Sequence, residues 1–180
     1  MKVSPTSLPD VLLIEPIVFG DERGFFFESY NQRALAEADL SATFVQDNHS
    51  LSAHGVLRGL HYQIEHPQGK LVRVCAGEVF DVAVDLRRSS PNFGRWAGVS
   101  LSSANKRMLW IPPGFAHGFL VVTDRAEFLY KTTDYWYPQH ERVLLWSDPA
   151  LAIDWPLDGK PIVAAKDAAG MTLALAESYP

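Results

Sequence analysis

The stretch VRVCAGEVFDVAVDL, residues 72–86, decides the expected fold because its side chains follow the two-residue period of a β-strand. β-Branched residues alternate with polar ones, and Ala76-Gly77-Glu78 interrupts the alternation with a plausible turn. The pattern repeats in four further segments, namely Trp96–Leu101, Arg107–Ile111, Gly118–Val122 and Glu127–Thr132. Many short strands at close spacing favour an antiparallel sandwich or barrel over alternating strands and helices. We therefore expect an all-β jelly roll, a double-stranded β-helix, with a few short helices.

Outside these strands, only Asn31–Leu40 is typical of a helix. Asn31 can cap its start, and Leu35, Ala36 and Leu40 fall roughly on one face. With 180 residues, 47% of them apolar, the chain can bury one sizeable core and is too short for two ordinary domains. We expect residues 1–180 to form a single domain. The prolines and tryptophans from about residue 138 onward predict an extended tail that wraps the barrel.

Charge and cysteine content exclude several classes of protein. A net charge of −5 argues against a nucleic-acid surface, so an anionic ligand would need a local group of arginines and lysines. The single cysteine, Cys75, permits no internal disulfide, and its apolar neighbours predict a small buried side chain. Neither a signal peptide nor an apolar run of membrane-spanning length is present. The sequence therefore predicts a cytoplasmic protein that binds neither nucleic acid nor membrane.

Polar and reactive residues are densest in three neighbouring segments: Gln46-Asp47-Asn48-His49, Arg58-Gly59-Leu60-His61-Tyr62-Gln63 and Gln68-Gly69-Lys70. Such residues between apolar strands are costly to bury unless they contact a ligand or each other. The alternative is a hairpin with solvated polar loops. We favour that alternative for the isolated histidines His49, His54, His66 and His140.

His61 and His117 together raise the question of a metal site. Small double-sheet barrels of the cupin type bind metal through histidines of two motifs, and Pro112-x-Gly114-x-x-His117 has the spacing of the second motif. The first motif normally offers His-x-His and a later glutamate, whereas the place of its second histidine is taken by Gln63. Two histidines without the usual partners make a weak transition-metal site. We therefore expect no metal and no other cofactor.

A series of short motifs covers the chain in order from near residue 20 to Asp167. They are RGFFFE (Arg23–Glu28), QDN (Gln46–Asn48), GVLRGLHYQ (Gly55–Gln63), PQGK (Pro67–Lys70), WIP (Trp110–Pro112), GFAHGF (Gly114–Phe119) and YKTTDY (Tyr130–Tyr135). In this ordered set the chain resembles the dTDP-4-dehydrorhamnose 3,5-epimerases, whose fold is cupin-like. The resemblance implies inversion of C3 and C5 of dTDP-4-dehydro-6-deoxy-D-glucose to give dTDP-4-dehydro-L-rhamnose, in dTDP-L-rhamnose biosynthesis.

Inversion beside a ketone requires a base, a group that stabilises the enolate oxygen, and an acid on the opposite face of the sugar. By the resemblance, His61 is the base and Asp167 its orienting partner, Lys70 stabilises the enolate and Tyr130 is the acid. Taken without the resemblance, Asp167 could be a solvated tail residue, Lys70 a surface lysine and Tyr130 a packed aromatic.

The resemblance also assigns residues around the nucleotide and the sugar. They are Arg23, Glu28, Gln46, Asp47, Asn48, Arg58, Lys70, His117, Glu141 and Lys166. Guanidinium groups suit a diphosphate, so Arg23 and Arg58 are its leading candidates, and Phe19 or Phe26 could stack on the thymine. The family forms dimers in which an N-terminal segment reaches the partner's site. A homodimer with Arg23 and Glu28 acting in trans is therefore expected.

The chain departs from the family pattern at one position, because Trp136 stands where the second of two adjacent tyrosines is usual. This substitution bears on whether one or both carbons are inverted. A mono-epimerase acting only at C3 or C5 is therefore the nearest alternative. A metal-dependent cupin oxygenase and a non-catalytic sugar-nucleotide binding module are more remote. Gln63 argues against the first of these, and His61, Lys70 and Tyr130 argue against the second.

Overall fold

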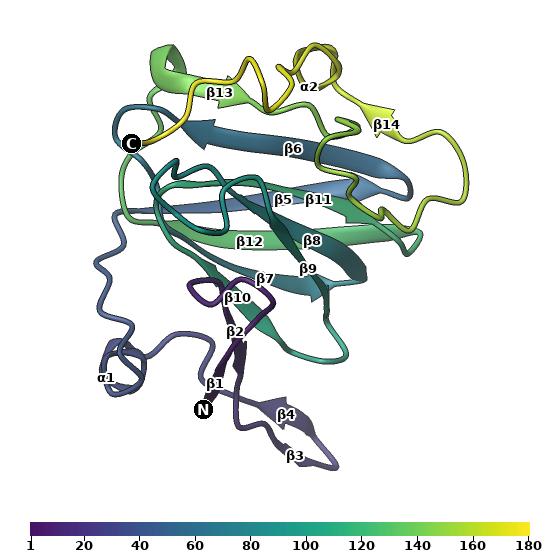
Figure 1. The fold of residues 1–180 in the computed structure, drawn as a ribbon. Coiled ribbons are helices and arrows are strands. Elements are labelled where there is room, and N and C mark those ends of the chain that lie inside the picture. The colour runs from purple at the N-terminus through teal and green to yellow at the C-terminus, as the bar shows by residue number, and fades with distance from the viewer.

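Two β-sheets face each other in the computed structural model, which describes residues 1–180 (Figure 1). The first sheet is antiparallel, with strand order β1-β2-β10-β7-β12-β5. Its strands are β1 (Lys2–Pro5), β2 (Leu12–Glu15), β10 (Met108–Ile111), β7 (Lys70–Ala76), β12 (Arg125–Thr132) and β5 (Gln46–Ala53). Apart from the β1–β2 pair, neighbouring strands are distant in sequence, as a jelly roll requires.

The second sheet has the order β13-β6-β11-β8-β9, and a short strand, β14, runs parallel to β6. Its strands are β13 (Glu141–Val143), β6 (Val56–Gln63), β11 (Phe115–Val121), β8 (Glu78–Asp85), β9 (Trp96–Ser102) and β14 (Ile162–Val163). The predicted all-β jelly roll with short helices is thereby confirmed. The stretch at residues 72–86 divides as expected, since β7 and β8 join at Gly77, whose φ of +73° favours glycine.

The main core lies between the two sheets and is built from their inward-facing apolar residues. Val72 and Val74 contribute from β7, and Phe119 and Phe128 stack at 4.3 Å between ring centroids across the two sheets. The same alternation corrects one expectation. Cys75 is exposed, because residues with odd numbers on β7 point to the outer face of the sheet.

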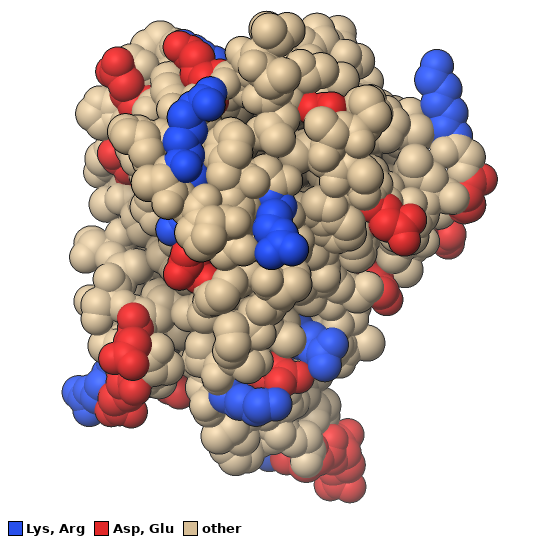
Figure 2. Space-filling view, viewed as in Figure 1, with Lys and Arg blue, Asp and Glu red and all other residues tan.

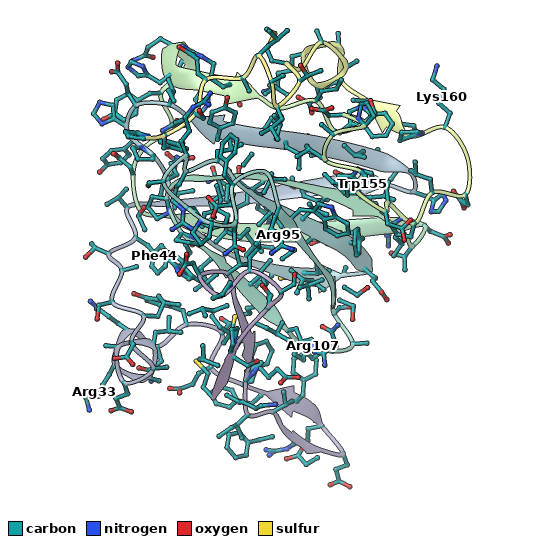
Figure 3. The ribbon with its side chains drawn as sticks, in the orientation of Figure 1. Arg33, Phe44, Arg95, Arg107, Trp155 and Lys160 are labelled. Carbon is teal, nitrogen blue, oxygen red and sulfur yellow. The ribbon has the colours of Figure 1, made fainter.

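The predicted helix begins as expected but is shorter. Asn31 caps α1 (Gln32–Ala36) by accepting a hydrogen bond from a backbone N–H of its first turn. Asp39, with φ of 60°, then turns the chain out of the helical conformation. Leu35 is buried against the first sheet, whereas Ala36 is exposed rather than part of the apolar face. Figure 3 shows Phe44 on the segment that leads from α1 back to the sheets.

In the segment after Pro138, β13 and β14 extend the second sheet beside β6, and later residues of the segment cover its outer face. A 3-10 helix (Pro138–His140) precedes β13, and β14 leads into α2 (Ala165–Ala168), which lies over β6 in Figure 1. Trp155 packs edge-on against Phe80 of β8 in a second apolar cluster between this segment and the sheet (Figure 3). This covering layer brings α2, and with it Asp167, against the strand that carries His61.

Two features of the surface bear on partners. The hairpin of β3 (Phe19–Asp21) and β4 (Gly24–Phe26) projects from the sheets (Figure 1). The rings of Phe19, Phe25 and Phe26 on this hairpin are exposed. On the face shown in Figure 2, lysines and arginines are interspersed with carboxylates and form no continuous basic surface. No helix has both the length and the apolar character needed to cross a membrane.

Candidate active site

A cavity of about 390 Å³ opens between the two sheets at the end where the inward-facing residues become polar. β5, β6, β7, β11 and β12 supply its walls, and the segment after β12 supplies its rim. The lining residues are Gln46, Asn48, His49, Ser50, Arg58, His61, Tyr62, Gln63, Gln68, Lys70, His117, Gly118, Phe119, Phe128, Tyr130, Trp136, Glu141 and Lys166. Most of the residues assigned from the sequence therefore meet in one place.

Two glycines allow the strands that carry His61 and His117 to approach closely. The two histidines are paired across β6 and β11, and the register of these strands shifts just after His117. A side chain on Gly118 would lie 2.5 Å from the carbonyl oxygen of Arg58, and one on Gly59 would lie 2.6 Å from the Cα of Gly118. Only glycine fits at this crossing. β11 also begins at Phe115 rather than at Gly118 as expected from the sequence, so His117 lies within the strand.

His61 and Asp167 form a close pair although 106 positions separate them in sequence. His61 Nε2 lies 2.6 Å from Asp167 Oδ1, and the Gly59 N–H donates to Oδ2 at 3.0 Å. The carboxyl group is only 2% exposed. Burial raises the pKa of Asp167, but the hydrogen bonds from His61 and Gly59 and the charge of His61 outweigh this and hold the pKa below its ordinary value. An ionised Asp167 fixes the imidazole through Nε2 and leaves Nδ1 as the ring nitrogen free to accept a proton.

Lys70 projects from the facing sheet and is 8% exposed. Its Nζ donates to the backbone carbonyl of His61 at 3.3 Å. Burial lowers the pKa of Lys70 to about 8, and the charges of Asp81 and Glu141 oppose part of that shift. The ammonium group is therefore mostly protonated at neutral pH. It lies beside the strand of His61 in a position to contact an anionic oxygen.

His117 is held by Asp81, a residue that sequence reasoning missed. His117 Nε2 lies 3.0 Å from both carboxylate oxygens, and both side chains are buried. Burial lowers the pKa of His117 more strongly than Asp81 raises it, and the charges of Lys70 and His61 lower it further. The neutral imidazole is thus fixed in orientation. The available signal was that Asp81 shares the inward face of β8 with the apolar residues Val79 and Ala83.

Tyr130 lies on β12 of the first sheet, opposite the sheet that carries His61. Burial raises the pKa of Tyr130 above its ordinary value, the charge of Glu141 adds to this, and Arg58 opposes it. The phenol therefore keeps its proton at neutral pH, and the same shift makes it a weaker acid than a free tyrosine. Its neighbour across the strands, Asn48, has a buried Nδ2 with no hydrogen-bond partner in the protein. A buried amide donor without a partner is rare unless a ligand uses it.

Charged side chains ring the opening of the cavity. Arg58 Nε donates to Ser52 Oγ at 2.9 Å and leaves the rest of the guanidinium free to contact an anion. Lys166 Nζ lies 3.0 Å from both carboxylate oxygens of Glu141. The site thus combines the buried His61–Asp167 pair with Arg58 and a Lys166–Glu141 ion pair.

The comparison with known proteins agrees with this geometry. The family model described as dTDP-4-dehydrorhamnose 3,5-epimerase matches residues 5–174. This chain belongs to that epimerase family. A dTDP-4-dehydrorhamnose 3,5-epimerase of Pseudomonas aeruginosa strain PAO1 is 63% identical over 181 residues, covering 100% of both chains. The protein of that name from Salmonella typhimurium strain LT2 is 59% identical over 175 residues, covering 96% of each chain.

Solved structures place the chain in the same family fold. A dTDP-6-deoxy-D-glucose-3,5-epimerase of Legionella pneumophila, in complex with dTDP-4-keto-L-rhamnose, matches with a TM-score of 0.95 and 52% identity over 98% of this chain and 94% of that chain. ChmJ of Streptomyces bikiniensis, a 3'-monoepimerase in complex with dTDP-quinovose, matches with a TM-score of 0.89 and 32% identity over 95% and 87%. The epimerase fold therefore serves enzymes of both kinds, and it does not by itself fix how many carbons are inverted.

Three residues that the epimerase resemblance assigned to substrate lie outside the cavity of this chain. Arg23 is exposed on the β3–β4 hairpin and bonds Asp21, and Glu28 accepts a hydrogen bond from Asn31. Asp47 faces away on β5 and pairs with Lys131 at 2.8 Å. In this structure none of these three side chains lines the cavity of its own chain.

Sequence reasoning also missed how Gln63 is used. From the sequence, Gln63 was noted only as the residue that replaces a metal-binding histidine. In the structure its side-chain amide makes hydrogen bonds to three backbone groups near the cavity. No group of three or more histidine, cysteine, aspartate or glutamate side chains is arranged to hold a metal ion. The four isolated histidines each pair with a carboxylate: His49 with Glu127, His54 with Asp158, His66 with Asp134 and His140 with Glu65. His49 is exposed, as expected of a solvated side chain, and is also among the residues that line the cavity.

Proposed function

We propose that this epimerase inverts C3 and C5 of dTDP-4-dehydro-6-deoxy-D-glucose and forms dTDP-4-dehydro-L-rhamnose. The observation that carries the proposal is the His61–Asp167 pair, 2.6 Å apart, on one wall of a cavity whose other wall bears Tyr130 and Lys70. A base and an acid on facing sheets can act on opposite faces of one sugar ring. That is the geometry that inversion at carbon requires.

Each proton transfer then uses groups already in place. His61 Nδ1 takes the proton beside the ketone, and the Asp167 carboxylate stabilises the resulting imidazolium. Lys70 places its ammonium by the C4 oxygen, where enolate charge develops, and so lowers the barrier more than it stabilises the neutral ketone. Tyr130 returns a proton from the opposite face. The route draws on no metal and no redox cofactor.

The remaining residues would hold the nucleotide and the sugar. Arg58 is suited to the diphosphate because its free guanidinium nitrogens can make charge-assisted bonds to phosphate oxygens. The unpartnered Asn48 Nδ2 offers a donor to a sugar or phosphate oxygen. Gln46, His117, Glu141 and Lys166 complete the substrate-binding set within the cavity lining.

Solvent isotope exchange tests the proposal. The protein is incubated with dTDP-4-keto-6-deoxyglucose in deuterated water, and NMR locates the exchanged carbons. We expect exchange and inversion at both C3 and C5, abolished by His61→Ala and retained by the matched control His54→Ala, whose ring lies on a distant turn. Exchange at one carbon alone would mean a mono-epimerase. Retained exchange in His61→Ala would mean that another group is the base.

We further propose that the working protein is a homodimer in which Arg23 and Glu28 reach the partner's cavity. The exposed rings of the β3–β4 hairpin support this, because apolar side chains gathered on a projecting element favour burial against another surface. Glu28 follows that hairpin directly in the chain. This arrangement would account for two substrate-binding residues that lie outside their own chain's cavity.

Subunit mixing tests the trans arrangement. Arg23→Ala protein, expected to be weakly active, and His61→Ala protein, expected to be inactive, are unfolded together and refolded as a mixture. If Arg23 acts in trans, each mixed dimer contains one intact site, because His61 of one subunit meets Arg23 of the other, and activity returns. If Arg23 acts in cis, every site stays defective and the mixture is no more active than its parents.

The cytoplasmic location and single-domain organisation stay predictions from the sequence.

A further inference from the structure

The backbone of residues 135–137, at the cavity rim, is held by side chains rather than by strand pairing. None of its three N–H groups donates to a backbone carbonyl. The Tyr135 N–H donates to Asp134 Oδ1, the Trp136 N–H to Gln46 Oε1 and the Tyr137 N–H to Gln63 Oε1. Tyr135 and Trp136 are exposed, whereas the Tyr137 ring stacks on His66 with 4.4 Å between ring centroids. The hydrogen bonds therefore hold the backbone on either side of Trp136.

Gln63 provides the anchor from within the protein. Its Oε1 accepts from the Tyr137 N–H at 2.7 Å, while its Nε2 donates to the Tyr135 carbonyl at 3.2 Å and to the His66 carbonyl at 2.7 Å. One amide thus spans both sides of Trp136. The Gln63 side chain is buried, so water could not replace these bonds. Release of the segment would therefore leave the amide of Gln63 without hydrogen-bond partners.

The position of Gln63 on β6 links this anchor to the site of proton transfer. Gln63 and His61 are two residues apart and so point to the same face of the strand. Both line the cavity, and so does Trp136, on either side of which Gln63 bonds the backbone. The strand that carries the base therefore also fixes the segment that bears Trp136.

From this arrangement we propose that Gln63 is a positioning residue, which holds Trp136 over the cavity so that the singly inverted sugar stays bound until its second carbon is inverted. The proposal rests on the double epimerisation proposed above. After the first inversion the sugar must reorient before the second proton meets His61, and an aromatic wall limits its escape during that interval. The amide, rather than any contact with the sugar, sets how well the wall is held.

The variant Gln63→Met keeps the volume of the side chain and removes all three hydrogen bonds. Sugars released at low conversion are reduced with borohydride, which preserves the C3 and C5 configurations for NMR. We expect the share of singly inverted sugar to rise roughly tenfold, as loss of this much hydrogen bonding would allow. The control Gln139→Leu, an exposed glutamine of the adjoining 3-10 helix without a side-chain hydrogen bond, should match wild type.

A double variant separates positioning through Trp136 from a general structural role. In a Trp136→Ala background, Gln63→Met should change the product ratio little further, because the wall it positions is gone. Equal and additive effects in both backgrounds would overturn the proposal. Incorporated 5-fluorotryptophan adds a readout independent of turnover: the Trp136 resonance, assigned with Trp136→Phe, should broaden or shift in Gln63→Met and not in Gln139→Leu.

The outcomes distinguish this proposal from the proposed function. If wild type inverts both carbons and Gln63→Met releases no more singly inverted sugar, only the positioning role is refuted. An unchanged Trp136 resonance in Gln63→Met would refute it as well. If wild type inverts neither carbon, the proposed function itself is wrong, and the role of Gln63 falls with it.

Discussion

Raising the pH should switch off catalysis through Lys70. Burial lowers the pKa of this lysine to about 8, so the ammonium is charged below that pH and increasingly neutral above it. A neutral amine cannot stabilise the enolate oxygen as a cation does. The value of kcat/KM for inversion should therefore fall about tenfold per pH unit above pH 8. The decline should level off once the charge-assisted bond is lost, about 10- to 150-fold below the neutral-pH value.

The stability of the protein should change in the opposite direction. A lysine whose pKa is about 8 in the folded protein and 10.5 when its side chain is free in water binds fewer protons folded than unfolded between these values. Stability therefore rises with pH across this window, by about 2 to 3 kcal/mol between pH 8 and pH 10. Lost activity accompanied by gained stability cannot be explained by alkaline unfolding. The window ends near pH 10, where tyrosines with raised pKa values, such as Tyr62 and Tyr130, begin to oppose folding.

The assay combines a pH profile of kcat/KM with urea unfolding at each pH, for wild type and Lys70→Met. The variant should have low activity that is flat from pH 7 to pH 9. Its stability should exceed that of wild type most at the lowest pH of the series, and the difference should shrink as the pH rises through 8 toward 10.5. An alkaline limb that keeps the same midpoint in Lys70→Met would refute the reasoning, because the titrating group would then be another residue.

Three further predictions concern the pair, the acid and the strand crossing. Asp167→Asn should lower kcat about 10- to 150-fold by removing a charged hydrogen-bond partner of His61, while calorimetry should show little change in dTDP affinity. Tyr130→Phe should still exchange substrate protons with deuterated water yet produce little inverted sugar, and loss of exchange would contradict its role as the acid. Gly118→Ala should lower the free energy of unfolding by about 1 to 3 kcal/mol in urea titrations, because its Cβ would meet a backbone oxygen. Gly159→Ala, which meets nothing within 4 Å, is the matched control and should change it by at most about 0.5 kcal/mol.

The fold was predictable because strand alternation is a local signal. Residues 72–86 show a two-residue period and a turn glycine, and the structure has β7, Gly77 and β8 at those places. The prediction of a buried Cys75 was wrong because it did not apply this alternation. Its apolar neighbours in sequence, Val74 and Ala76, point to the other face of the sheet, so they do not describe the surroundings of the thiol.

The site was predictable only in part, because its partners come from distant segments. Asp167 carries no local signal of catalysis, and only the family motif joined it to His61 across the chain. Asp81 was missed for the opposite reason: it looks like an ordinary polar member of an alternating strand, and its burial beside His117 appears only once the sheets face each other. From the sequence, Gln63 was considered only as the replacement of a metal-binding histidine. Its hydrogen bonds to the backbone of residues 135–137 could not be predicted because those residues are distant in sequence.

The cavity and the core are two ends of the same inward-facing rows of side chains. On β7 the row runs from Lys70 to Val72, on β12 from Tyr130 to Phe128, and on β11 from His117 to Phe119, each time from cavity to core. The apolar end excludes water from the polar end, and that exclusion lowers the pKa of Lys70 and keeps the Tyr130 phenol protonated. A shift of any of these strands by one residue would move its polar and apolar members to the outer face together. The packing that stabilises the barrel therefore also fixes which groups titrate in the cavity.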